Sequence, residues 1–227
     1  MAQITMFKVI RLISLFSACM LSIAAHAGVV MGGTRIIFVE GKKEATLSVT
    51  NQEKNTPYLI ESWIENFDQN NHSRVPFIVT PPLFRLDAEK ENLLRINYLG
   101  TPLPKDRESV FWLNVKSISP MPREKSNQLQ VNIKSKFKLF YRPKGLAGNQ
   151  ADAWQQLSFR REGNQLIAHN PTPYFVSFYS LSVNHHAIQA PGMIGPGEDR
   201  HWSVADSGAV SWSAINDYGG ITEERTR

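Results

Sequence analysis

The side chains that most often carry out chemistry in proteins are sparse in this sequence and form no reactive pattern. The adjacent histidines His185 and His186 would point to opposite faces of a strand, so they do not form a metal-binding pair. The sequence contains neither a Gly-x-Ser-x-Gly nucleophile elbow nor a glycine-rich phosphate loop, and its single cysteine, Cys19, lies close to the N-terminus. We therefore predict that the protein is not an enzyme and has no catalytic residue, metal site or cofactor.

The overall charge is modest. The formal net charge is +5, from 25 lysines and arginines against 20 aspartates and glutamates. Nucleic-acid-binding domains normally concentrate basic residues in one patch or stripe, and so mild an excess does not indicate one. We expect no nucleic-acid partner.

The first 27 residues have the pattern of an export signal. Two basic residues precede an apolar stretch at 12–25, and Ala25-His26-Ala27 supplies a small-x-small cleavage pattern. We expect a signal peptide at 1–27 that is cleaved after Ala27, and therefore an exported protein. The apolar stretch is short for a membrane span and no later segment has the necessary length, so we expect no membrane insertion.

A second interpretation of this leader is a lipoprotein signal that is cleaved before Cys19. Phe16 suits that pattern poorly. If the leader is an ordinary signal peptide, Cys19 leaves with it, and the mature chain depends on its hydrophobic core without disulfides.

Beyond the leader, alternation of apolar and polar residues predicts an all-β protein. Ala45, Leu47 and Val49 share one side of a predicted strand, which is the mark of a strand with one buried face. No segment shows a sustained helical period. Strands are predicted at 34–38, 45–50, 58–65, 77–80, 92–98 and 109–117. Their length and spacing are typical of a β-sandwich.

The segment 143–152 interrupts this pattern with one proline, two glycines and small polar residues. We interpret it as a linker between an N-terminal domain at 28–142 and a smaller C-terminal domain at 153–227. In the second domain, strands are predicted at 154–160, 165–169, 174–183, 200–204 and 211–215.

The segment 128–142 is the longest alternating stretch. Leu129, Val131 and Ile133 begin its apolar side, and lysines occupy much of the other side. A strand of this length extends roughly 50 Å, whereas a domain of about 100 residues has a radius of gyration of about 13 Å. One interpretation is a long core strand whose lysines face water. The other is a partly uncovered strand that pairs with a strand of another chain.

Five motifs, in order along the chain, resemble those of the periplasmic pilus chaperones of the chaperone–usher pathway. They are TRIIF at 34–38, LPKDRESVFWLNV at 103–115, KFKLFYRP at 136–143, NPTPYFV at 170–176 and INDYGG at 215–220. The second departs from the family beyond its end, where Ser119 stands before Pro120 in place of the usual proline. The resemblance implies two immunoglobulin-like β-sandwich domains set at an angle with a cleft between them, and a periplasmic location.

The resemblance also assigns roles to individual residues. Arg35 and Lys138 match a basic pair that grips the C-terminal carboxylate of the bound subunit, a task that suits an arginine fork and a lysine point charge. The residues of the donor strand, which completes the subunit's fold, correspond to Leu129, Val131 and Ile133. The interdomain latch, which has a structural role, corresponds to Glu108, Arg142 and Asp217.

The implied partners are pilus subunits and an outer-membrane usher, while self-association of the free protein stays open. The short connection between about 117 and 128, which has no cysteine, resembles the short-loop branch of the family. The alternatives are other binding modules, such as a pilin, an adhesin or a carbohydrate-binding sandwich. The predicted absence of cysteine from the mature chain speaks against a pilin, and tryptophans within strand patterns are more simply explained as core.

Overall fold

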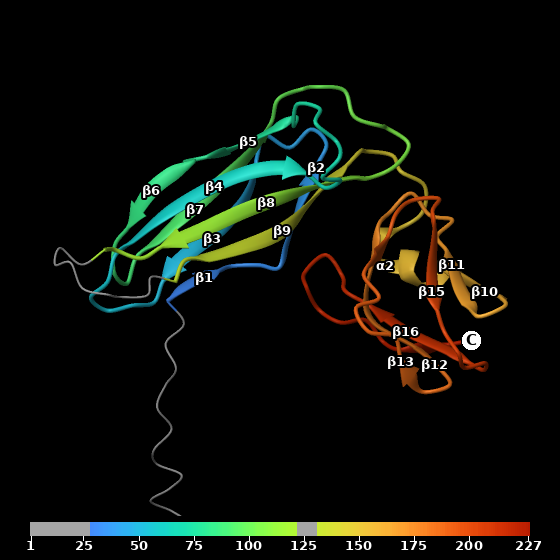
Figure 1. Cartoon of the computed structure of the whole chain (residues 1–227). Coiled ribbons are helices and arrows are strands. Elements are labelled where there is room, and N and C mark those ends of the chain that lie inside the picture. Colours follow the sequence, from blue (N-terminus) through green and yellow to red (C-terminus); the bar gives the residue numbers. More distant parts are fainter. Residues whose placement is uncertain (1–27, 122–130) are drawn as a thin grey trace, which may run out of the picture.

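The computed structural model describes residues 28–121 and 131–227. The predicted signal peptide at 1–27 and the predicted donor-strand residue Leu129 lie outside the described residues. Two β-sandwich domains follow one another along the chain (Figure 1). The predicted all-β class is confirmed, since the described part contains only one short α-helix and one 3-10 turn besides its strands.

The first domain consists of two sheets packed around one core. One sheet has the order β1-β3-β7-β5 and the other β2-β9-β8-β4-β6. All pairs are antiparallel except β2 and β9, which run parallel. The strands are β1 (Val29–Met31), β2 (Arg35–Val39), β3 (Ala45–Asn51), β4 (Tyr58–Asn66), β5 (Phe77–Thr80), β6 (Leu83–Leu86), β7 (Glu91–Tyr98), β8 (Ser109–Ile118) and β9 (Ile133–Arg142).

Alternation explains which side chains fill this core. Leu47 and Val49 from one sheet meet Leu113 and Leu139 from the other, and all four are almost fully buried. Burial of each such side chain stabilises the fold by about 1.5–3 kcal/mol. The core thereby fixes the register of β9, whose other face carries the cations of the functional site.

The second domain repeats this plan on a smaller scale. One sheet has the order β10-β11-β15; in the other, β13-β12-β16-β17 are joined in that order and β14 pairs with β12. Trp212 is fully buried at its centre, and its indole N–H donates to the carbonyl oxygen of Trp154 at 2.9 Å. The strands are β10 (Ser158–Glu162), β11 (Gln165–His169), β12 (Val176–Val183), β13 (His186–Ala187), β14 (Met193–Ile194), β15 (Asp199–Ser203), β16 (Val210–Ala214) and β17 (Arg225–Thr226).

Two sequence predictions are wrong at strand ends. The strand predicted from 154 begins only at Ser158, because α2 (Gln150–Ala153) and the 3-10 turn η1 (Trp154–Gln156) precede it. The side chain of Asn149 caps α2 by accepting from the amide of Ala151 at 3.1 Å. The strand predicted over 128–142 begins in the described part at Ile133, opposite Ser117, because its partner β8 ends at Ile118. Pro120, two residues further on, has no N–H with which to extend the pairing.

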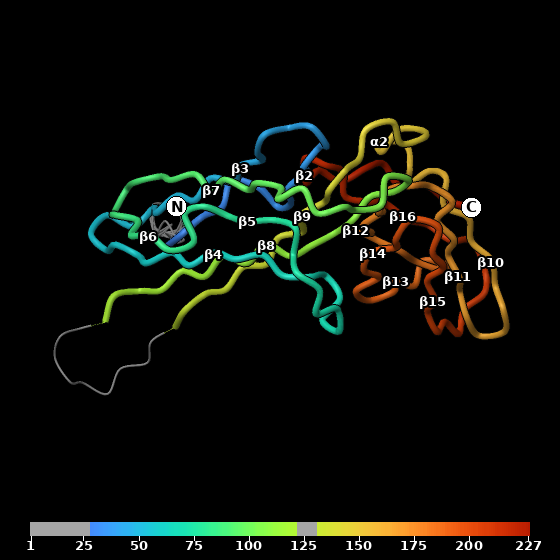
Figure 2. Tube along the Cα trace, turned by 90° about the horizontal axis from the view of Figure 1, so that it is seen from above, coloured from blue at the N-terminus to red at the C-terminus, as the bar shows by residue number. Residues whose placement is uncertain are grey.

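One end of the first domain, where β8 begins and β9 ends, contacts the second domain. The strands of the first domain run toward the second, whose strands β10, β11 and β15 are steeply inclined to them (Figure 1), and Figure 2 shows the domains in line when seen from above. The rings of Phe140 and Phe175 approach to 5.8 Å between centroids, and the amide of Glu108 donates to the carbonyl of Pro173 at 2.9 Å. Among the described residues, no helix is long and apolar enough to cross a membrane.

Candidate functional site

Arg35 and Lys138 lie side by side where the two domains meet. They are direct register partners in the parallel pair β2 and β9, and both are half-buried. A guanidinium nitrogen of Arg35, Nη1, donates to the carbonyl of Ile215 at 3.0 Å, and Nζ of Lys138 donates to the hydroxyl of Ser177 at 3.4 Å. Both acceptors belong to the second domain, so the structure brings the predicted pair together at the domain boundary.

The surroundings of this pair are unusually short of negative charge. Burial, together with the positive charges of Arg35 and Arg200, lowers the pKa of Lys138 from its ordinary 10.5 to about 8. Burial also lowers the pKa of Arg35, an effect that nearby Asp217 opposes. Among the described residues, neither Arg35 nor Lys138 has a carboxylate within ion-pair distance. Such a pair can bind an anion, and its donor geometry suits a carboxylate.

Sequence reasoning missed the residues that hold this pair in place. The guanidinium of Arg35 lies 6.0 Å from the ring centre of Phe140, and Ser177 and Ile215 supply the acceptors. Phe140 left one signal in the sequence, because it is an aromatic residue on the side of the strand that otherwise carries lysines. Ser177 and Ile215 left none, since their role depends on how the two domains meet.

The predicted donor row is exposed where the structure describes it. Val131 and Ile133 are 66% and 63% exposed, so the interpretation of these residues as internal core is wrong. Strand β2 pairs with β9 only from Lys138 onward. In the described chain, no strand pairs with residues 133–137 on the side opposite to β8. Residues 131–137 therefore offer two bare apolar side chains, Val131 and Ile133, and an unpaired backbone edge from Ile133 onward.

The exposed edge and the cation pair belong to one continuous strand. Lys138 follows Ile133 by five positions, which corresponds to about 17 Å of extended chain. On the face of β9 that also carries Lys138, Lys134 and Lys136 lie 5.0 and 4.8 Å from the ring centres of Trp63 and Trp112. An extended chain pairing with residues 133–137 would thus reach Arg35 and Lys138 with its terminus.

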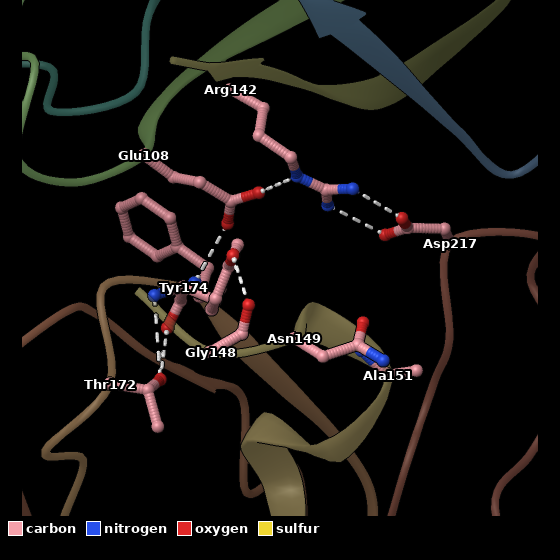
Figure 3. Close-up of polar contacts among 9 residues, drawn as sticks. Glu108, Arg142, Gly148, Asn149, Ala151, Thr172, Tyr174 and Asp217 are labelled. Atoms are coloured by element: carbon pink, nitrogen blue, oxygen red, sulfur yellow. Dashed lines mark hydrogen bonds and ion pairs between the residues drawn. The ribbon is translucent and has the colours of Figure 1, made fainter. Parts of the chain in front are cut away.

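Glu108, Arg142 and Asp217 come together across the domain boundary (Figure 3). Nε of Arg142 donates to Glu108 at 2.6 Å, while its two terminal nitrogens donate to both oxygens of Asp217 at 2.6 and 2.9 Å. The second oxygen of Glu108 accepts from the amide of Phe175 at 2.9 Å. This bidentate, charge-assisted network ties the ends of β8 and β9 to the second domain.

The electrostatics of this network differ from those of the cation pair. Burial alone would lower the pKa of Arg142, but Asp217 and Glu108 together raise it. Burial raises the pKa of Glu108, and this is opposed by Arg142 and by the amide of Phe175. The network is a fully paired set of charges, which suits a structural role.

The histidines do not assemble a site. His169 pairs with Asp199 at 2.7 Å and His186 with Asp206 at 3.0 Å, both at the surface. In residues 28–121 and 131–227, no group of three or more potential ligands could hold a metal ion.

Two family models match almost the whole mature region. Residues 28–147 match "Pili and flagellar-assembly chaperone, PapD N-terminal domain". Residues 152–226 match "Pili assembly chaperone PapD, C-terminal domain". The gap between the two matches falls within the predicted linker.

Curated relatives agree with these models. The chain is 42% identical over 218 residues to the chaperone protein FimC of Escherichia coli (strain K12), covering 94% of this chain and 90% of the relative. It is 41% identical over 225 residues to the probable fimbrial chaperone LpfB of Escherichia coli O157:H7, covering 94% and 96%. The short-loop assignment stays a prediction.

Solved structures share the fold and name the same class. The SafB chaperone, solved with the Salmonella enterica SafA pilin, is 31% identical with a TM-score of 0.82, and the match covers 90% of this chain and 98% of the neighbour. The periplasmic chaperone SfaE is 38% identical with a TM-score of 0.74, covering 88% and 98%. The chain therefore belongs to the PapD family of pilus-assembly chaperones.

Proposed function

We propose that this chaperone binds newly exported pilus subunits in the periplasm and delivers them to an outer-membrane usher. A related chaperone was solved in complex with a pilin, and another is described as periplasmic. A signal peptide at 1–27, cleaved after Ala27, would take the chain to that compartment. The proposed activity is binding, without turnover and without a cofactor.

The observation that carries the proposal is the pair of unneutralised cations at the domain boundary. Within the part of the chain that the structure describes, the side chains of Arg35 and Lys138 donate to the neutral oxygens of Ile215 and Ser177 and to no carboxylate. A subunit's C-terminal carboxylate would supply the missing anion. Charge-assisted hydrogen bonds of this kind contribute about 1.5–3 kcal/mol each.

The exposed start of β9, together with the residues just before it, would complete the subunit. A pilus subunit that lacks its last strand leaves its core open as a groove, and Val131 and Ile133 present bare apolar side chains beside an unpaired edge. Leu129 would extend this row by one more side chain. Three such side chains supply roughly 5–9 kcal/mol before the cost of ordering.

The remaining predicted residues would set the geometry of capture. Glu108, Arg142 and Asp217 hold the second domain against the first, which places Ser177 and Ile215 beside the cation pair. A buried ion-pair network is a weak source of stability but can fix an orientation. The residues that contact the usher are unassigned, and whether the free chaperone self-associates stays open.

The test is capture of a pilus subunit that is co-expressed with this chain. The wild-type chaperone should co-purify with it as a soluble one-to-one complex, and Val131→Glu should stay folded but lose the subunit. Ile78→Glu is the matched control, because Ile78 is also an exposed apolar residue, at 47%, but lies on β5 in the other sheet. Capture by Val131→Glu at the wild-type level would contradict strand donation. Circular dichroism of Val131→Glu checks that the variant is folded, as expected for a side chain that is 66% exposed.

A further inference from the structure

Arg200 occupies a position where a charge is not expected. Arg200 lies on β15, on the same side of the strand as Trp202. Its register partner on the neighbouring β11 is the core residue Ala168, and that of Trp202 is the core residue Leu166, so this side of the sheet is directed toward the core. The guanidinium of Arg200 lies 5.8 Å from the ring centre of Trp202. A charge on the inward side of a small sandwich is costly unless something uses it.

The backbone beside Arg200 leaves room for its guanidinium. Gly192 has a φ of +81°, a conformation that favours glycine. A Cβ added there would stand 2.6 Å from Nη2 of Arg200. The absence of a side chain at 192 therefore lets the arginine cross this turn, which directly precedes β14.

A short chain of contacts joins Arg200 to the cation pair. Its Nη1 donates to the carbonyl of Met193 at 3.0 Å, and Met193 is the register partner of Ser177 in the β12–β14 pair. The hydroxyl of Ser177 accepts from Lys138 at 3.4 Å, and its carbonyl accepts from the amide of Ile215 at 2.9 Å. Arg200 and Lys138 therefore both contact the β12–β14 pair. Arg200 does so from within the second domain and Lys138 from the first.

Arg35 and Arg200 each have one buried hydrogen-bond donor that lacks an acceptor among the described residues. In the described part of the chain, Nε of Arg35 and Nε of Arg200 are buried and have no hydrogen-bond partner. Buried donors without partners are rare in native proteins and often indicate a functional role. The positive charge of Arg200 is also close enough to contribute to the lowered pKa of Lys138.

We propose that Arg200 is the third member of the carboxylate anchor, so that cations from both domains receive the subunit's C-terminus. This inference rests on the proposed role of Arg35 and Lys138. A carboxylate has about four lone-pair sites, enough to accept from three cations at once. The charges that act on Lys138 are those of Arg35 on β2 and Arg200 on β15, while Asp217, whose charge acts on Arg35, is already held by Arg142.

The proposed three-cation anchor gives the interdomain latch a specific purpose. Arg35 and Lys138 stand on adjacent strands of one sheet, so their spacing is set within the first domain. Arg200 belongs to the second domain, so its distance from the pair depends on the contact between Arg142 and Asp217. Correct domain orientation would then be a condition for full carboxylate affinity.

The experiment compares two probes that differ only in terminal charge. One is a short alternating valine–threonine peptide with a free C-terminal carboxylate, and the other is the same peptide as its C-terminal amide. Binding is measured by NMR titration of the full-length mature chaperone. We expect Arg200→Gln to weaken carboxylate binding about tenfold, with little change for the amide. Arg225→Gln, an exposed arginine on β17 of the same domain, is the control and should change neither.

The outcomes separate this inference from the function on which it rests. If Arg35→Gln removes the preference for the carboxylate peptide and Arg200→Gln leaves it intact, Arg200 is no part of the anchor and the proposed function survives. If the wild-type protein shows no preference, both proposals fail. Equal weakening of both peptides by Arg200→Gln would indicate structural damage and would also overturn the assignment.

A second readout does not depend on any ligand. NMR titration of the Lys138 ammonium group should give a higher pKa in Arg200→Gln than in the wild-type protein, because one of the repelling charges is gone. An unchanged Lys138 pKa in a folded variant would place Arg200 too far away to act with the pair.

Discussion

Strand β9 carries two basic residues at the domain boundary, Lys138 and Arg142, and they are in opposite electrostatic states. Arg142 lies between Glu108 and Asp217, with three hydrogen bonds of 2.6–2.9 Å to their oxygens. Lys138 lies four residues earlier on the same side of the strand. Its ammonium group donates to a hydroxyl at 3.4 Å and is repelled by the charges of two arginines. The pKa of Arg142 is raised and that of Lys138 is lowered.

The difference indicates how to distinguish a structural cation from a binding one. A cation whose partners are all supplied by its own chain has no capacity left for a ligand, and its removal leaves buried carboxylates unpaired. A desolvated cation without a carboxylate lowers the stability of the fold, because burial disfavours its charged form. Such a residue suits a site whose anion comes from another molecule. Proximity to the domain boundary alone would not have separated the two.

The largest expected effect comes from breaking the paired site. Arg142→Met leaves the carboxylate of Glu108, which is 3% exposed, without its cation. We expect the free energy of unfolding to fall by about 3–5 kcal/mol. Urea denaturation of the mature protein at neutral pH measures it.

Arg160→Met provides the contrast for that experiment. Arg160 also pairs with two carboxylates, Glu162 and Asp199, but at the surface, where ion pairs contribute little. Its loss should leave the urea midpoint nearly unchanged. If Arg142→Met proved equally mild, the network would not be the structural latch that the comparison requires.

The next effect comes from breaking the unpaired site. Arg35→Gln should weaken subunit capture by about 1.5–3 kcal/mol, or roughly ten- to a hundredfold, while leaving the urea midpoint close to that of the wild type. Titration calorimetry with a purified subunit measures the affinity. Arg95→Gln serves as control, since Arg95 lies in the same domain but pairs with Glu44 at the surface. Undiminished affinity in Arg35→Gln would remove this residue from the anchor.

The sequence was sufficient for the parts of this comparison that depend on local pattern. The period-two alternation that places Leu47 and Val49 in the core is visible without a structure, and so is the long alternating segment that ends at Arg142. The candidate cations, however, came from the resemblance to a family and not from spacing. Arg35 and Lys138 are neighbours only because two strands distant in the chain pair in parallel, and no periodicity encodes that register.

What could not be predicted depends on tertiary contact or on very short elements. Strands of two or three residues, such as β1, β14 and β17, are too brief to show a period. The turn at α2 and η1 depends on the cap supplied by Asn149. Arg200 looked like an ordinary strand residue, because its inward direction follows from the pairing of β15 with β11.

The pH dependence of capture is the third expected effect. Lys138 has a pKa of about 8 in the free protein, and a bound carboxylate would stabilise its charged form and raise that value. Affinity should therefore be constant below about pH 8 and decrease above it, by about tenfold at one pH unit higher. Calorimetric titrations with a subunit's C-terminal peptide across this range measure the change. The decrease should be absent from Lys138→Met, and a flat profile in the wild type would argue against Lys138 as a ligand.

The smallest expected effect has the opposite sign. The folded-state pKa of Lys138 is about 8, below its ordinary 10.5, so the unfolded chain holds this proton more tightly. The charge on Lys138 therefore destabilises the fold below about pH 8, and this penalty disappears as the pH rises toward 10.5. Because the side chain is only half-buried, solvent screening reduces the penalty, and we expect Lys138→Met to raise the free energy of unfolding at pH 7 by about 1 kcal/mol. The same substitution should weaken capture, whereas a loss of stability in Lys138→Met would show that Lys138 contributes to the fold as Arg142 does.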